Sequence, residues 1–93
     1  MLYEVLSTKQ FKKSLKKLKR SGSFNLNKLV DLIDLISEGK QLPLYSRDHF
    51  LKGKMKDYKE CHVEPDLLLI YILDAENKQV RLISLGSHSE LFG

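Results

Sequence analysis

Hydrophobic and polar positions along the chain follow periods that predict strands at both ends and two helices between them. Residues 2–6 are a short apolar-rich stretch typical of a strand. Ser7, with Gln10 three residues later, has the spacing of a capping box, so a helix is expected to start there. The helix should end at the Ser-Gly-Ser break of residues 21–23. Its narrow apolar stripe, spaced i, i+4 and i+7, consists of Phe11, Leu15 and Leu18.

A second helix follows the break, because apolar residues again recur at helical spacing. Gly39 is placed to cap its C-terminus. Two helices joined by so short a break are expected to form an antiparallel hairpin. The apolar face of the second helix contains Leu26, Leu29, Val30, Ile33 and Ile36, and Leu32 and Leu35 widen it.

The C-terminal half reads as a loop followed by three strands. Residues 41–56 keep neither period and are expected to be a loop, which carries His49. Residues 58–63, 67–73 and 80–85 have strand patterns, and the middle one is apolar enough to be buried on both faces. The order β-α-α-β-β-β predicts an α+β fold. We expect a mainly antiparallel sheet of about four strands, with the helical hairpin packed on one face.

Length and composition predict one small domain that spans residues 1–93. A chain of 93 residues, 42% of them hydrophobic, can bury a single modest core. The lone Cys61 excludes an internal disulfide and fits a reducing cytosol. The N-terminus lacks the features of a secretory signal, and the longest apolar run, residues 67–73, is far shorter than the roughly 20 residues of a membrane helix. A soluble cytoplasmic protein with no membrane partner is expected.

Positive charge is concentrated in the first helix. The chain has 16 Lys and Arg against 12 Asp and Glu, and residues 9–20 hold seven basic residues and no acidic one. Such a run is often only a solvated helix face. Alternatively, nucleic acid or an acidic protein covers it.

A polar cluster, ECHVEPD at residues 60–66, precedes the most apolar strand. If residues 58–63 form a strand, Glu60 and His62 point to one face, while Cys61 and Val63 point to the other. The apolar pair should face the helices, which leaves Glu60 and His62 on the open face of the sheet. Adjacent strand residues do not face each other, so the pattern disfavours a Cys61–His62 nucleophilic dyad. Asp66, after a proline, should lie at the mouth of the strand near the same face.

The three histidines are candidates for proton transfer if they converge. Taken singly, His49, His62 and His88 are each more typical of exposed or structural positions. Together, beside carboxylates, they could take and give protons in one turnover. Zinc is an alternative, because these residues and Asp66 are all possible ligands. The chain has no Cys-x-x-Cys, HExxH or close His-x-His spacing, so neither a metal nor another cofactor is expected.

Several motifs of this half resemble a known family. The segment DHFLKGKMKDYKECHVEPDLLLIYIL, followed by GSHSELFG, resembles the C-terminal half of the YafQ-type toxins in the RelE/ParE superfamily of bacterial toxin–antitoxin systems. The shared features are a D-H-x-L-x-G segment, an H-V-x-P-D turn before an apolar strand containing Ile-Tyr, and a terminal G-x-H-x-x-L-F-G. The N-terminal half matches only in the order of its elements.

The resemblance implies a RelE-like fold and an endoribonuclease, an mRNA interferase that cuts messenger RNA, typically on the translating ribosome. It also implies a cognate antitoxin that holds the enzyme inactive and through which alone the toxin contacts operator DNA. Cleavage by attack of the ribose 2′-OH on the adjacent phosphorus needs a base, an acid and positive charge at the phosphate, and it needs no metal.

Carried over residue by residue, the family's functional positions fall on five residues of this chain. We expect His88 to be general acid or base, with His49 and His62 as its complementary partner and phosphate donor. Asp66 is expected to orient a histidine or accept the 2′-OH proton. Phe92 follows His88 at i+4 of a helical turn started by Ser87 or Ser89, where its ring stacks on a base or caps the core.

The chain departs from the family pattern at three positions. Glu60 stands where relatives often have aspartate, Met55 where they commonly have tryptophan, and Ser84 where an arginine can bind phosphate. The phosphate contact must then come from elsewhere. The candidate substrate-binding residues, beside Phe92 and Glu60, are Lys52, Lys54, Lys56 and Arg81.

Two alternative functions remain compatible with the sequence. ParE-type poisons of DNA gyrase share the fold and do not cut RNA, but the three histidines are unexpected in such a protein. A basic module that binds nucleic acid or the ribosome without catalysis would need only the lysine-rich helix. An RNA cleavage assay separates both from a nuclease.

Overall fold

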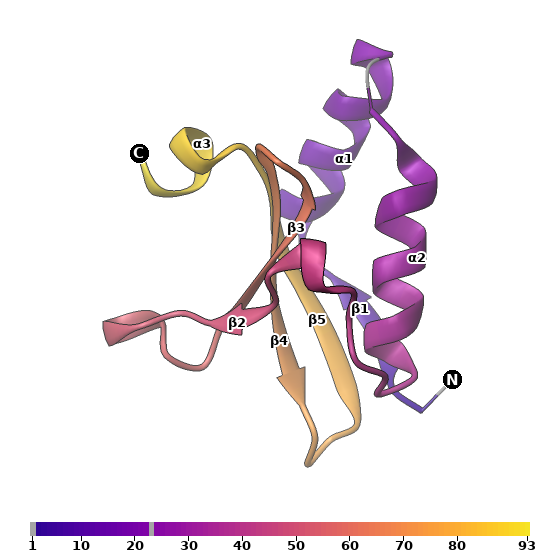
Figure 1. Ribbon diagram of the computed structural model, residues 1–93, viewed down its shortest axis with the longest axis vertical. Coiled ribbons are helices and arrows are strands. Elements are labelled where there is room, and N and C mark those ends of the chain that lie inside the picture. Colours follow the sequence, from indigo (N-terminus) through magenta and orange to yellow (C-terminus); the bar gives the residue numbers. More distant parts are fainter. Residues whose placement is uncertain (1, 23) are drawn as a thin grey trace.

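A five-stranded sheet with two helices on one face makes up most of the computed structural model, which describes residues 2–22 and 24–93 (Figure 1). Ser23, the last residue of the expected break, lies outside the described residues. Two short 3-10 helices are labelled η. The elements follow in the order β1 (Glu4–Ser7), α1 (Lys9–Ser21), α2 (Leu26–Ser37), η1 (Leu44–Ser46), β2 (His49–Phe50), η2 (Gly53–Met55), β3 (Lys59–Glu64), β4 (Leu67–Asp74), β5 (Gln79–Gly86) and α3 (His88–Phe92). The predicted α+β class is confirmed.

The sheet is mixed and contains one strand more than the sequence pattern indicated. Its order is β1-β5-β4-β3-β2, with β1 parallel to β5 and the other pairs antiparallel. The additional strand is β2, inside the segment 41–56 that was expected to be a loop. It is two residues long, too short to show a period, and it exists because His49 and Phe50 pair with Glu60 and Lys59 of β3.

Helix α1 is capped one residue later than the sequence suggested. Ser7 is the last residue of β1, and the N-cap is Thr8, whose side-chain oxygen accepts a hydrogen bond from the Phe11 N–H at 3.0 Å. The Thr8 hydroxyl also donates to the Ile83 carbonyl of β5 at 2.6 Å. This second bond ties the cap to the sheet, a tertiary contact that no local motif reveals. The C-terminus is as predicted, because Gly22 adopts a left-handed conformation with φ of 74°.

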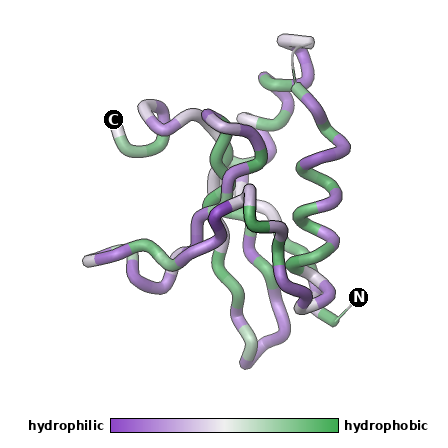
Figure 2. The backbone as a smooth tube through the Cα atoms, in the orientation of Figure 1, coloured by the Kyte–Doolittle hydropathy of each residue, from purple (hydrophilic) through white to green (hydrophobic). Residues whose placement is uncertain are grey.

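Helix α2 presents a slightly different face to the core than its apolar pattern predicted. Asn25 caps it by accepting from two backbone N–H groups, and Gly39 has the expected positive φ of 69°. Leu26 and Val30 are exposed, although both belong to the predicted stripe. Figure 2 shows α2 alternating between hydrophobic and hydrophilic residues along its turns. The residues of this helix that are buried in the core are Leu29, Leu32 and Ile36.

The core lies between the helices and one face of the sheet. α1 packs on β5, and α2 packs on β3 and β5. Leu69 and Tyr71 of β4 belong to this core, while Leu68 and Ile70 are buried on the opposite face, so this part of β4 is enclosed on both sides as predicted. No helix within residues 2–22 and 24–93 is long and apolar enough to cross a membrane.

Burial of Cys61 in this core makes the stability sensitive to alkali. Burial raises the pKa of the thiol from an ordinary 9.0 to about 12, and the Asp48 and Glu60 carboxylates add to the rise. Above pH 9 the unfolded chain loses a proton that the folded chain keeps. The unfolding free energy should therefore fall by up to about 1.4 kcal/mol per pH unit until the pH approaches the folded pKa. Urea unfolding at a series of pH values above neutrality measures this slope.

Cys61→Ala is the control for that measurement. The variant should lack the part of the slope that begins near pH 9, and it should keep the contribution of Tyr71, whose pKa is raised above 10.0 chiefly by burial. An identical slope in the variant and the wild type would show that the thiol is not the cause.

Candidate active site

Cross-strand pairs form two rows on the face of the sheet opposite α1 and α2. Directly opposed residues of antiparallel strands share a face. The first row contains His49, Glu60, Ile70 and Ser84, and the second contains His62, Leu68 and Gly86. The alternation predicted along β3 is confirmed, since Cys61 and Val63 lie in the core on the other face. Cys61 is fully buried with a raised pKa, which makes it an inert thiol rather than a nucleophile.

Glu60 lies between two imidazoles. Its Oε1 is 3.9 Å from Nε2 of His49 and 3.6 Å from Nε2 of His62. The Glu60 side chain is 8% exposed, while those of His62 and His49 are 22% and 50% exposed. The carboxylate therefore lies beneath the rings, at ion-pairing distance from whichever imidazole is protonated. We call these three residues the His49–Glu60–His62 cluster.

The ring of His49 is held in one tautomer. Its Nδ1 lies 2.5 Å from the backbone oxygen of Arg47. A carbonyl can only accept, so Nδ1 carries the hydrogen and Nε2 is left facing Glu60. His49, which was expected on a loop, is instead oriented by Arg47 and Glu60 and by the pairing of β2 with β3.

Asp66 and His88 form a second group at the start of α3. Ser87 caps this helix in a capping box with Glu90, and the Asp66 Oδ1 accepts from the His88 backbone N–H at 3.3 Å. The His88 and Phe92 rings meet edge to face, with centroids 5.1 Å apart and an interplanar angle of 61°. The predicted i, i+4 arrangement is thus confirmed. Phe92 is 43% exposed, so its ring does not close the core.

The two groups lie at the same end of the open face. His62 shares its row with Gly86, two strand spacings or about 10 Å away, and α3 begins two residues after Gly86. Figure 1 shows α3 and β2 on the side of the sheet away from α1 and α2. His49, Glu60, His62 and His88 are therefore positioned from three elements, β2, β3 and α3, around one face, with Asp66 of the β3–β4 turn at its rim.

The candidate phosphate-binding residues lie at different distances from this face. Lys52, Lys54 and Lys56 are exposed on the segment around η2, which projects from the sheet in Figure 1. Arg81 is not brought to the histidines. Its guanidinium binds the Asp74 carboxylate at 3.1 Å near the β4–β5 turn, three residues before Ser84 and so about 10 Å along the strand.

Metal ligation was the alternative use of the same residues. Within the described part of the chain, no group of three or more His, Cys, Asp and Glu residues is arranged to hold a metal ion. The Nε2 atoms of His49 and His62 lie 3.9 and 3.6 Å from the carboxylate between them, as in an ion-pair cluster.

Comparison with known proteins settles the family. Residues 3–93 match the model of a family described as bacterial toxin of type II toxin–antitoxin system, YafQ. The chain belongs to the YafQ family. The mRNA interferase toxin YafQ of Escherichia coli K12 is 41% identical over 78 residues, which cover 83% of either chain. The resemblance seen in the C-terminal motifs is thereby confirmed, and it extends to the N-terminal half.

Solved structures of similar toxins have the same fold. A metal-bound toxin from Helicobacter pylori superposes with a TM-score of 0.91 at 40% identity, covering 99% of this chain and 100% of the other. YafQ in the E. coli DinJ–YafQ toxin–antitoxin complex superposes with a TM-score of 0.85 at 35% identity and covers both chains fully. The RelE-like architecture expected from the resemblance is therefore confirmed.

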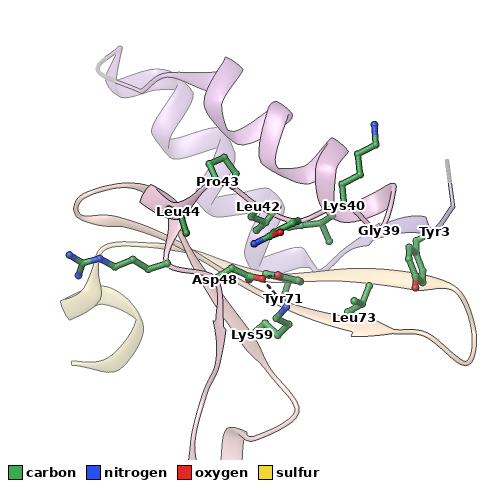
Figure 3. Close-up of a pocket in the computed structure, with 13 residues that line it drawn as sticks. Tyr3, Gly39, Lys40, Leu42, Pro43, Leu44, Asp48, Lys59, Tyr71 and Leu73 are labelled. Atoms are coloured by element: carbon green, nitrogen blue, oxygen red, sulfur yellow. Dashed lines mark hydrogen bonds and ion pairs between the residues drawn. The ribbon is translucent and has the colours of Figure 1, made fainter.

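A second polar cluster of this YafQ-family chain was missed from the sequence. Asp48, directly before His49, accepts hydrogen bonds from the Tyr71 hydroxyl and from Lys59 Nζ, the latter at 2.8 Å. Figure 3 shows Asp48, Lys59 and Tyr71 side by side in the wall of a pocket on the helix side of the sheet. Lys59 Nζ also lies 5.1 Å from the centre of the Phe50 ring. The signal in the sequence that could have found it was the Asp48-His49 pair. Adjacent residues of an extended chain point to opposite faces, so a histidine on the open face implies an aspartate on the helix side.

This Asp48–Lys59–Tyr71 clamp positions His49. β2 makes only two residue pairs with the sheet, which is little to hold an edge strand. Fixing Asp48 to β3 and β4 on the helix side turns the next residue, His49, to the open side. Tyr71 is almost fully buried, so its hydroxyl needs this acceptor.

The clamp predicts energetic coupling between Asp48 and Tyr71. Tyr71→Phe and Asp48→Ala should each lower the unfolding free energy by about 1–3 kcal/mol, because Asp48→Ala leaves the buried Tyr71 hydroxyl without its acceptor and Tyr71→Phe removes one of the two donors to Asp48. The double variant should lose less than the sum, with a coupling of at least about 0.5 kcal/mol. Amide hydrogen exchange of residues 49–50 should accelerate in both single variants. Denaturant unfolding and exchange NMR measure these effects.

Tyr3→Phe is the matched control, since Tyr3 lines the same pocket and is not bonded to Asp48. It should change neither quantity. Additive losses with unchanged exchange in β2 would mean that the clamp does not position His49.

Proposed function

We propose that this chain is the toxin of a type II toxin–antitoxin pair and an endoribonuclease that cuts messenger RNA. Its membership of the YafQ family and its 41% sequence identity to the E. coli mRNA interferase support the proposal. The observation that carries it is the His49–Glu60–His62 cluster, which shares one face of the sheet with His88. Three histidines are unexpected in a gyrase poison and would be incidental in a binding protein.

The reaction that suits these groups is attack of the ribose 2′-OH on the adjacent phosphorus. A base removes the hydroxyl proton, the O–P bond to the 5′-oxygen breaks, and an acid protonates that leaving oxygen. The products are a 2′,3′-cyclic phosphate and a 5′-hydroxyl. Fixed positive charge stabilises the phosphorane-like transition state, which carries more negative charge on its oxygens than the diester does.

The histidines divide these tasks. Nε2 is the ring nitrogen of His49 that is available to the substrate, because Nδ1–H is held by the Arg47 carbonyl and the 3.9 Å from Nε2 to Glu60 Oε1 is too long for a hydrogen bond. A protonated His49 or His62 donates to the phosphate while Glu60 balances its charge from beneath. His88 is the general acid or base, from its exposed position on α3.

Asp66 acts through His88. Its Oδ1 binds the backbone N–H of His88 and so fixes the first turn of α3. Of the two roles expected for Asp66, this contact supports orientation of a histidine rather than acceptance of the 2′-OH proton. Asp66 is thus proposed as a positioning residue.

Phe92 and the lysines are proposed to hold the RNA. The half-exposed Phe92 ring, in contact with His88, is available to stack on a base. Lys52, Lys54 and Lys56 are exposed on the projecting segment, where they can contact backbone phosphates of the RNA strand outside the site. Arg81 is already paired with Asp74 and is the weakest candidate.

The proposed partners are the translating ribosome and a cognate antitoxin in the bacterial cytoplasm. The basic face of α1 lies on the layer opposite the histidines, where it can meet ribosomal RNA or an acidic antitoxin segment. E. coli YafQ forms a complex with the antitoxin DinJ, and the same arrangement is proposed here. Operator DNA is contacted only through the antitoxin.

His88→Ala should cut messenger RNA about 10²- to 10⁴-fold more slowly than the wild type, because it removes a general acid or base. Primer extension in a translating extract, with and without ribosomes, locates the cuts, and analysis of the RNA termini should give 2′,3′-cyclic or 3′-phosphate ends. Unchanged cleavage by His88→Ala would overturn the assignment.

Asp66→Asn is the companion variant, because asparagine retains an oxygen that can accept from the His88 N–H. A positioning role leaves most of the activity, whereas a proton-accepting role makes Asp66→Asn as slow as His88→Ala.

Phe92→Ala separates a substrate role from a packing role. Because Phe92 is 43% exposed, the variant should melt near the wild-type temperature and lose about tenfold or more in cleavage, the value of one lost stacking contact. Phe92→Tyr keeps the ring and should keep the activity. Thermal melts and cleavage rates are the measurements. A loss of about 3 kcal/mol or more in stability would instead assign the ring to packing.

A further inference from the structure

A second pocket opens beside the His49–Glu60–His62 cluster. Its volume is about 450 Å³, and it is lined by Lys28 of α2, Tyr45 of η1, Arg47 and residues 62–65. It adjoins β3 beyond the end of β2, since β2 pairs only with Lys59 and Glu60. His62 belongs both to the pocket and to the cluster, so the pocket adjoins the cluster at that residue.

The Tyr45 ring is held at the pocket on a fixed backbone. It is 53% exposed, although the next residue, Ser46, is fully buried. The hydroxyl and the N–H of Ser46 both donate to the Pro43 carbonyl, at 2.7 and 3.1 Å, and η1 packs on β3. Lys28 Nζ lies 5.7 Å from the centre of the Tyr45 ring. A half-exposed aromatic ring on a rigid turn is the usual platform for a nucleobase.

Arg47 has a backbone conformation that links this pocket to His49. Its φ is 47°, a left-handed value that residues with a side chain rarely adopt. Its carbonyl accepts from Nδ1 of His49, while its side chain lines the pocket. Such strain is retained where the surrounding structure uses it. Here one conformation orients a catalytic ring and supplies a cation to the adjoining space.

The charges of the lining suit a nucleotide. Lys28 and Arg47 are two cations, and Glu64 is one carboxylate that can accept from the exocyclic amine of a base. Ser84 occupies the first row where an arginine could have bound phosphate. Positive charge for the RNA backbone is instead available from Lys28 and Arg47, which line the same pocket as His62.

We infer that this pocket binds the nucleotide adjacent to the scissile phosphate, with its base stacked on Tyr45 and its phosphate held by Arg47 and Lys28. The inference rests on the proposed function, and it adds a defined subsite to the nuclease. An RNA strand whose scissile phosphate lies at His62 and His49 delivers its next nucleotide to the pocket.

NMR titration of the isotope-labelled protein with 5′-mononucleotides, namely AMP, GMP, CMP and UMP, tests the subsite without cleavage. Saturable shifts are expected at Lys28, Tyr45, Arg47 and Glu64. Tyr45→Ala and Arg47→Asn should each weaken the affinity by about tenfold or more, and Tyr45→Phe should leave it unchanged. Asparagine tolerates a left-handed backbone, so Arg47→Asn removes the charge without disturbing the turn. The NMR spectrum itself shows that each variant is folded.

Lys78→Asn is the matched control. Lys78 is the other non-glycine residue with a positive φ among those described, 52°, and it lies beside the β4–β5 turn. This variant loses the same charge from the same backbone conformation and should bind as the wild type does. Shifts confined to the α1 lysines, or an equal loss in Lys78→Asn and Arg47→Asn, would overturn the inference.

Failure of the subsite and failure of the nuclease are distinguishable in this design. Messenger RNA cleavage without mononucleotide shifts at the pocket would overturn the subsite alone. Mononucleotide binding at Tyr45 and Arg47 by a protein that cuts no RNA would support the subsite and overturn the proposed activity.

Discussion

Strand β4 is enclosed on both faces, and the placement of the candidate catalytic side chains depends on this constraint. Leu69 and Tyr71 pack toward the helices, while Leu68 and Ile70 are buried on the open side. β3 and β5 are hydrogen-bonded to the two edges of β4, so each of their paired residues points to the same face of the sheet as the β4 residue opposite it. A slip of one residue would turn the Glu60 carboxylate into the core, at a cost of several kcal/mol for an unpaired buried charge.

Among the described residues, the elements that carry His49 and His88 contribute no side chain to the buried core. β2 has two residues and α3 has five, and both are too short to persist alone. Specific polar contacts hold them: the Asp48 clamp for β2, and the capping box with the Asp66 contact for α3. β2 and α3 are thus attached to the sheet through a few side-chain hydrogen bonds. We expect both to unfold locally at a lower free energy than the central strands.

The sheet lies between most of the positive charge of α1 and the His49–Glu60–His62 cluster. α1 packs on β5 on the other face of the sheet (Figure 1), and its Lys13 and Lys17 line a pocket together with Glu90 of α3. The second pocket, which shares His62 with the cluster, supplies Lys28 and Arg47, and the projecting η2 segment supplies exposed lysines. Charge on α1 and charge beside His62 thus belong to different elements and can be altered by separate substitutions.

Amino-acid order by itself determined four of the five strands and the two long helices in their order, the helix ends at Gly22 and Gly39, and the face of the sheet that each β3 residue occupies. These follow from local rules, because glycine permits a left-handed backbone and strand residues alternate. The same rules placed His88 and Phe92 one helical turn apart with Ser87 or Ser89 as the cap, and the structure has Ser87. The three histidines and Asp66 were nominated by their residue chemistry and by a family resemblance in short motifs, and neither gives distances.

Tertiary structure alone decided which of several locally equivalent choices the chain takes. Thr8 rather than Ser7 caps α1, because the Ile83 carbonyl of β5 accepts its hydroxyl. His49 lies on a strand rather than in a loop, because it pairs with Glu60 of β3 and because Asp48 is bonded to Lys59 of the same strand. These partners are distant in sequence, so no local pattern indicates them. A two-residue strand has no period, and a hydrogen bond across the sheet leaves no local pattern. Such contacts are set by the packing of the whole chain, which is why the order of residues did not reveal them.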